Sequence, residues 1–157
     1  MKGDKKVITA LNDALSEELS AVNQYFLHAE MCENWGFEKV AGIIKKTALD
    51  EMKHAEALIE RILFLEGIPN MTKYMPLLIG KTVPETLQNN LKLELGAIKS
   101  YNKSIKIACE ANDSGSAELF KKHLLDEEGH ADLFETQLDV IEKVGLQNYL
   151  AHSANHD

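Results

Sequence analysis

Two Glu-x-x-His pairs, Glu51/His54 and Glu127/His130, have the spacing that places a carboxylate and an imidazole on one face of a helix. The pattern DExxHA occupies residues 50–55 and again residues 126–131, an offset of 76. Carboxylates combined with imidazoles are typical of iron and manganese sites, whereas zinc and copper sites more often use Cys or additional His. A single pair of this kind is a weak signal, so it is the repetition that indicates metal chemistry.

Glu18 and Glu94 are related by the same offset, and each is the one carboxylate in a helical stripe of apolar residues. Six polar side chains are therefore expected in the interior near the middle of the fold: Glu18, Glu51, His54, Glu94, Glu127 and His130. Four buried carboxylates repel one another unless they are neutralised, and two divalent cations supply the required charge. Glu17 corresponds to Leu93 in the repeat and is expected to face solvent.

Other polar residues lie close to this set. Tyr25 and Tyr101 stand two turns beyond the lone glutamates, either as core aromatics or as groups that hydrogen-bond a ligand or donate one electron. Asp50 is a further candidate for a supporting role, although Asp50 and Asp126 also fit plain surface charges. The remaining histidines have no partnered spacing and are expected at the surface: His28, His123, His152 and His156.

Met52 follows Glu51 directly and is rotated about 100° around the helix, so it is expected to face outward. An outward methionine suits a contact between subunits. Its sulfur is also a ligand that haem iron accepts.

Long helices are needed to position these residues. The three prolines lie within residues 69–84, and the rest of the chain is rich in Leu, Ala, Glu and Lys with helical periodicity. Helices are expected at about 5–34, 37–66, 84–111 and 116–144, with a short helix at 146–152. Residues 82–85 (TVPE) have the pattern of a capping box.

The connections between these helices predict the topology. Short turns near residues 35 and 113 make two antiparallel hairpins. The 16 residues from 67 to 82 are long enough to run the length of the bundle, which makes the second and third helices parallel. The expected fold class is all-α: a ferritin-like four-helix bundle with one long crossover and a short C-terminal helix.

The composition and charge of the chain argue against several classes of protein. The 157 residues, 45% hydrophobic and 27% charged, suit one folded domain over residues 1–157 rather than a disordered chain. A net charge of −8 disfavours binding to nucleic acid. Cys32 and Cys109 lack the spacing of a thiolate metal site. No apolar run approaches the roughly 20 residues of a membrane span, and the N-terminus lacks a signal-peptide pattern, so a soluble cytoplasmic protein is expected.

At these residues the chain resembles the bacterioferritins, over nearly its whole length. The motifs that carry the resemblance occupy residues 1–4, 23–28, 50–55, 58–67, 127–130 and 145–150. The resemblance implies that the six interior groups hold two iron ions at a ferroxidase site, with Glu51 and Glu127 bridging. It also implies that Met52 ligates haem b between two subunits, and that the protein forms a homo-oligomer, a hollow shell of twenty-four subunits.

The expected function is iron storage and detoxification by a ferroxidase, which oxidises Fe(II) with dioxygen or peroxide and keeps the mineral in the shell. Haem would transfer electrons during iron release, with a ferredoxin-type reductant as partner. One alternative is a di-iron peroxidase similar to rubrerythrin, which turns over peroxide without storing iron; the lack of a CxxC segment argues against it. Another is a helical assembly protein whose glutamates form a buried polar network without metal.

Overall fold

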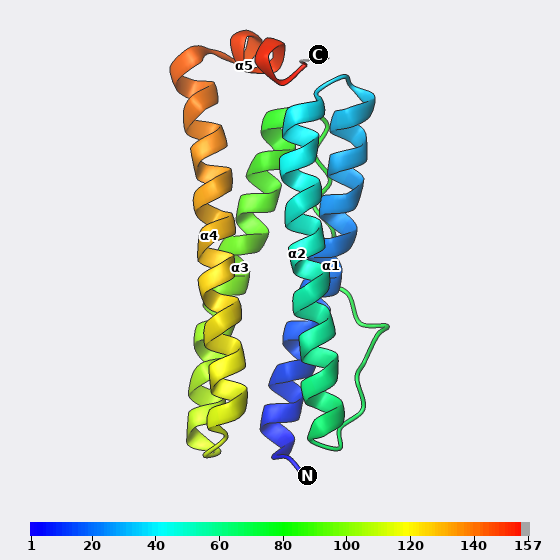
Figure 1. The fold of residues 1–157 in the computed structure, drawn as a ribbon, viewed down its shortest axis with the longest axis vertical. Helices are drawn as coiled ribbons and strands as arrows, with labels where there is room; N and C mark the ends of the chain where they lie inside the picture. Colours follow the sequence, from blue (N-terminus) through cyan, green and yellow to red (C-terminus); the bar gives the residue numbers. More distant parts are fainter. Residues whose placement is uncertain (155–157) are drawn as a thin grey trace.

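The helices of the computed structural model, which describes residues 1–154, begin and end close to the expected positions (Figure 1). Within the described residues there are four long helices, a short fifth and no strand: α1 (Lys5–Asn34), α2 (Glu38–Phe64), α3 (Val83–Glu110), α4 (Ser114–Val144) and α5 (Leu146–Ser153). Each boundary lies within two residues of the prediction, which confirms the all-α class. No helix in this part of the chain is long and apolar enough to cross a membrane.

Side-chain caps explain where α1 and α3 begin. The Asp4 carboxylate accepts from the Lys6 amide at 2.7 Å, and the Thr82 hydroxyl accepts from the Glu85 amide at 3.3 Å. The Glu85 carboxylate accepts from the Lys81 amide at 2.6 Å, one residue before the position it would reach in a standard capping box. The predicted capping box is thus confirmed in its first half and modified in its second.

Two hairpins and one long connection make up the bundle. Helix α1 packs antiparallel to α2, and α3 packs antiparallel to α4. Gly36, at φ 94°, takes the left-handed conformation that the short α1–α2 turn requires. The connection between α2 and α3 returns along the bundle, so these two helices run parallel as predicted (Figure 1).

The crossover is attached to α1 by a ladder of hydrogen bonds. Three of its backbone amides donate to polar side chains that follow one another at every fourth position of α1. The pairs are Met75 with Ser20, Leu78 with Gln24 and Gly80 with His28, at 2.8, 2.8 and 2.9 Å. These bonds satisfy amides in a segment that has no regular secondary structure of its own.

The apolar core consists of two clusters along the bundle. The first contains Leu11, Leu15, Leu58, Ile62 and Phe120, and the second contains Tyr25, Ile44, Leu87 and Phe134. The six predicted polar residues fall between these clusters in sequence on every long helix, so a polar layer interrupts the core at mid-bundle.

Candidate metal centre

All six predicted ligand side chains are buried together inside the bundle. Each of the four glutamates is 1% exposed, and the two histidines are 5% and 8% exposed. Helices α1 and α3 contribute one glutamate each, and α2 and α4 contribute one Glu-x-x-His pair each. The expectation that these residues face the interior is therefore confirmed.

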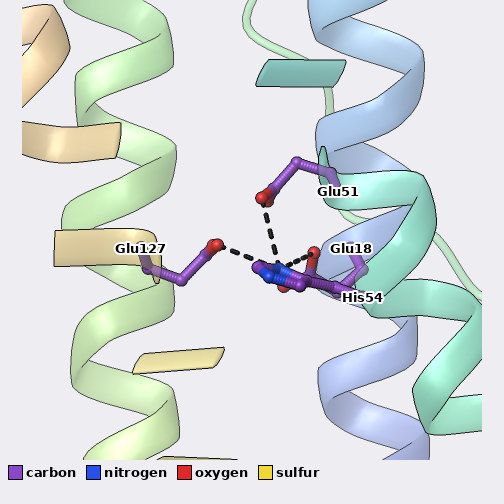
Figure 2. A group of neighbouring side chains, drawn as sticks. All are labelled: Glu18, Glu51, His54 and Glu127. Carbon is purple, nitrogen blue, oxygen red and sulfur yellow. Dashed lines mark hydrogen bonds and ion pairs between the residues drawn. The ribbon is translucent and has the colours of Figure 1, made fainter. Parts of the chain in front are cut away.

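The six residues form two groups of four that overlap. In each group the candidate ligand atoms all lie within 4.8 Å of one another. The groups are Glu18, Glu51, His54 and Glu127, drawn in Figure 2, and Glu51, Glu94, Glu127 and His130. Glu51 and Glu127 belong to both groups, so their carboxylates lie close to both candidate cation positions.

Each histidine turns its Nδ1 atom toward the carboxylates. His54 Nδ1 lies 3.3 Å from Glu18 Oε2, 3.4 Å from Glu51 Oε1 and 3.2 Å from Glu127 Oε1 (Figure 2). His130 Nδ1 lies 3.1 Å from Glu51 Oε1 and 3.4 Å from Glu127 Oε1. The Nδ1 atoms are thus the ring nitrogens available to two neighbouring cations.

The opposite ring nitrogen of each histidine contacts an aspartate from the other hairpin. His54 Nε2 lies 2.8 Å from Asp126 Oδ2, and His130 Nε2 lies 3.1 Å from Asp50 Oδ2. An N–H donated to a carboxylate orients the ring and raises the basicity of the other nitrogen. The supporting position considered for Asp50 is observed, and Asp126 takes the equivalent position in the other half.

Both tyrosines donate hydrogen bonds to the lone glutamates of the opposite hairpin. The Tyr25 hydroxyl lies 2.6 Å from Glu94 Oε1, and the Tyr101 hydroxyl lies 2.9 Å from Glu18 Oε1. Of the roles considered for these side chains, the geometry matches a hydrogen bond to a candidate ligand. Burial raises the pKa of both tyrosines, and the nearby glutamate charges raise it further.

The buried glutamates of the cluster are costly as anions unless positive charge lies close to them. Burial raises the pKa of Glu94 to about 8 and raises the pKa values of Glu18 and Glu51. Burial opposes the charged form of His54 and His130, but the negative carboxylates close to both rings raise the two pKa values well above their usual range. In the metal-free protein, the groups with raised pKa values therefore keep their protons, and these protons offset the negative charge that metal cations would otherwise offset.

Unpartnered polar atoms show that the donor set fits metal ions. Glu51 Oε1, Glu94 Oε2, Glu127 Oε1 and His130 Nδ1 are buried without a hydrogen-bond partner. A buried polar atom without a partner is costly, and ordinary packing leaves few of them. Three of these atoms belong to carboxylates and one to an imidazole, the donor types suited to iron or manganese.

Three residues expected at the surface are in fact buried or half-buried. Glu17 accepts a hydrogen bond of 2.7 Å from the Ser100 hydroxyl, and burial raises its pKa to about 7. The prediction for Glu17 was wrong because α3 packs over this side of α1. His28 is buried too, with Nδ1 2.7 Å from Asn90 Oδ1, because it anchors the crossover.

His123 is the third residue that the surface prediction misplaced. Its ring stacks on that of His54, with centroids 4.1 Å apart, and its Nδ1 lies 3.1 Å from the Tyr101 hydroxyl. Burial lowers its pKa to about 3. The signal was present, since steps of three and four residues from Phe120 to Glu127 pass through position 123.

The two other histidines have different outcomes. His152 is exposed, as predicted. His156 lies outside the described residues.

Comparisons with known proteins agree with the observed fold. The family model described as a ferritin-like domain matches residues 8–144. A bacterioferritin of Brucella melitensis is 47% identical over 149 residues, covering 95% of this chain and 92% of the relative. Bacterioferritins of Streptomyces coelicolor and Mycobacterium avium are 43% and 41% identical, covering 96% of this chain and 90% and 95% of those relatives.

Proposed function

This chain belongs to the bacterioferritin family of ferritin-like proteins, and on that premise we propose that it is a ferroxidase that stores and detoxifies iron. The observation that carries the proposal is the pair of overlapping four-residue groups in the polar layer. Two Fe(II) ions would be held there as substrate, one by each group, with Glu51 and Glu127 shared. Bound iron would supply the redox chemistry, each Fe(II) giving one electron to dioxygen or peroxide.

The chain's own residues have definite tasks in this reaction. The four glutamates offset the charge of two cations, and Nδ1 of each histidine completes one set of ligands. Asp50 and Asp126 hold the opposite ring nitrogens, which keeps the imidazoles in the required tautomer. The two tyrosine hydroxyls fix the lone glutamates, so these ligands do not reorient when the charge of the metal changes.

The experiment begins with metal-free protein loaded with Fe(II) under anaerobic conditions and then mixed with dioxygen. We expect a fast oxidation phase that saturates near two Fe(II) per chain, followed by further iron kept in solution. The Glu127→Ala variant should lose the fast phase, because one shared carboxylate is missing from both groups. Glu128→Ala is the matched control, since the neighbouring Glu128 is exposed and belongs to neither group.

Each result of this experiment favours a different function. A fast phase in the Glu127→Ala variant would contradict the assignment of the site. Fast oxidation without retention of further iron would favour the peroxidase alternative without storage. Slow oxidation in the wild type, at the rate of protein-free buffer, would favour another metal or a structural role.

The proposal includes a haem b site and a multi-subunit shell that works in the cytoplasm. Met52 on α2 is 47% exposed, which suits a side chain that ligates haem shared with a second copy. Leu49, one turn earlier, is 44% exposed and would add an apolar contact for the macrocycle. Haem would pass electrons from a ferredoxin-type reductant to stored iron. A Met52→Leu variant that binds haem as the wild type does would contradict this role.

A further inference from the structure

A cavity of about 290 Å³ lies between α1, α3 and the crossover and ends at the metal centre. Its inner end is formed by the four glutamates of the polar layer: Glu18, Glu51, Glu94 and Glu127. Its remaining wall is mostly apolar and includes Ala21, Met75, Pro76, Leu78, Leu93 and Ala97. The volume accommodates several small molecules, given that one water takes up roughly 30 Å³.

The cavities on the opposite side of the metal centre are lined by a different kind of side chain. Between α2 and α4, the cavities that reach His54 and His130 are lined by charged side chains, among them Asp50, Lys53 and Asp126. In the apolar cavity the charged groups other than the four glutamates are Glu17, which is bound by Ser100, and the exposed Lys92.

The two kinds of cavity favour different reactants, because water solvates Fe(II) strongly and dioxygen weakly. Fe(II) is strongly hydrated, and moving a charge past apolar walls costs free energy unless polar groups replace its water. Dioxygen is small, neutral and apolar, and it loses no hydrogen bonds when it enters such a space. The apolar cavity therefore suits the oxidant better than the metal.

We propose that this cavity is the binding and access site for dioxygen, an inference that rests on the proposed ferroxidase function. Dioxygen enters between α1, α3 and the crossover and meets the metal ions on the side of the four carboxylates. The crossover contributes directly, because Met75, Pro76 and Leu78 form part of the wall. The hydrogen-bonded ladder to α1 keeps these three residues in place.

Two glycines offer a matched pair of variants. Gly96 lines the apolar cavity and Gly129 lines the charged cavities, and each stands two residues after a ligand glutamate. A Cβ atom added at either position meets nothing within 4 Å, so the first side-chain atom has room at both sites. Gly96→Phe and Gly96→Leu should fill the apolar cavity, and Gly129→Phe is the control on the opposite side.

Two measurements test the proposal. Xenon, an apolar probe of dioxygen's class, should bind in the cavity of pressurised crystals of the metal-free wild type and not in Gly96→Phe. Each protein is then loaded with Fe(II) anaerobically, and the oxidation rate is followed against dioxygen concentration. We expect the rate per dioxygen to fall about tenfold or more in Gly96→Phe, less in Gly96→Leu, and to stay at the wild-type value in Gly129→Phe.

The outcomes separate this inference from the proposed function. Equal rates in the wild type and both Gly96 variants, or a wild-type cavity without xenon, would overturn the dioxygen site while the ferroxidase stands. A larger loss in Gly129→Phe than in Gly96→Phe would place dioxygen entry on the charged side and overturn it too. Xenon binding by a wild type that does not oxidise Fe(II) would refute the ferroxidase and with it the oxidant role.

Discussion

The two candidate ligand histidines are each held by an aspartate from the opposite hairpin. Asp126 of α4 contacts His54 of α2, and Asp50 of α2 contacts His130 of α4. The tyrosines follow the same crossed arrangement, since each bonds a glutamate of the other half. The internal repeat therefore has a structural counterpart: each half completes the surroundings of the other half's candidate ligands.

The aspartate contacts give a prediction about metal affinity. Asp126→Asn should weaken binding of two Mn(II) per chain by about 10–100-fold, because His54 loses the carboxylate that orients it. Isothermal titration of metal-free protein measures the affinity. Asp139→Asn, at an exposed position of α4, is the matched control and should bind as the wild type does. Equal affinities in the two variants would show that Asp126 is only a surface charge.

The buried acids give a prediction about pH. In metal-free protein the pKa values of Glu94 and Glu17 are raised to about 8 and about 7, so the folded chain retains protons that the unfolded chain releases near pH 4.5. The stability that they contribute is complete below pH 4.5 and is lost as pH rises through 7 and 8. The raised pKa values of His54 and His130 act in the same direction above pH 6.5. The lowered pKa of His123 acts oppositely, but only below pH 6.5.

We therefore expect the Tm of metal-free protein to fall as pH rises from 6.5 toward 8. Glu17→Gln should reduce the slope, because one group with a raised pKa is removed. Scanning calorimetry at several pH values tests both statements. A Tm that rises over this interval would contradict the assignment of protons to the cluster.

At the scale of elements, the helices were predictable and the path of the crossover was not. Apolar residues that recur every three or four positions identify each long helix, and the length of residues 67–82 is enough to predict parallel second and third helices. The attachment of this segment depends on single backbone amides, which leave no periodic pattern. A polar series on α1, Ser20, Gln24 and His28, was its one visible sign.

The ladder predicts that His28 is structural. His28→Leu should destabilise the protein by about 1–3 kcal/mol, because the buried Gly80 amide and the Asn90 side chain lose a partner. Denaturant unfolding of metal-free protein gives the free energy, and hydrogen exchange of the Gly80 amide should accelerate. His152→Leu, at an exposed histidine, is the control. Unchanged stability and exchange in His28→Leu would refute the anchoring role.

At the scale of the whole molecule, the polar layer divides the apolar core into two clusters. Its six members were predictable because the repeat singles them out, and His123 lies on the same inward stripe of α4 as Phe120 and Glu127. Asp126 was not predictable, because it reaches the layer through its contact with His54 of α2, and no spacing within α4 states which face a neighbouring helix covers. The layer costs stability while its carboxylates lack cations, because burial penalises each charge.

Metal binding should therefore stabilise the entire bundle. Mn(II), which binds without the oxidation that complicates Fe(II), should add about 2.7 kcal/mol per site at a hundredfold excess over its Kd. For a chain of this length, one such site raises Tm by roughly 5–10 °C. Calorimetry of the wild type with Mn(II) and with a chelator measures the shift. Glu51→Gln should lose most of it, because Glu51 belongs to both four-residue groups, while the exposed Glu128→Gln should retain it. A wild-type Tm indifferent to Mn(II) and chelator would instead make the glutamates a structural polar network, the one reading of this fold in which the layer needs no cation.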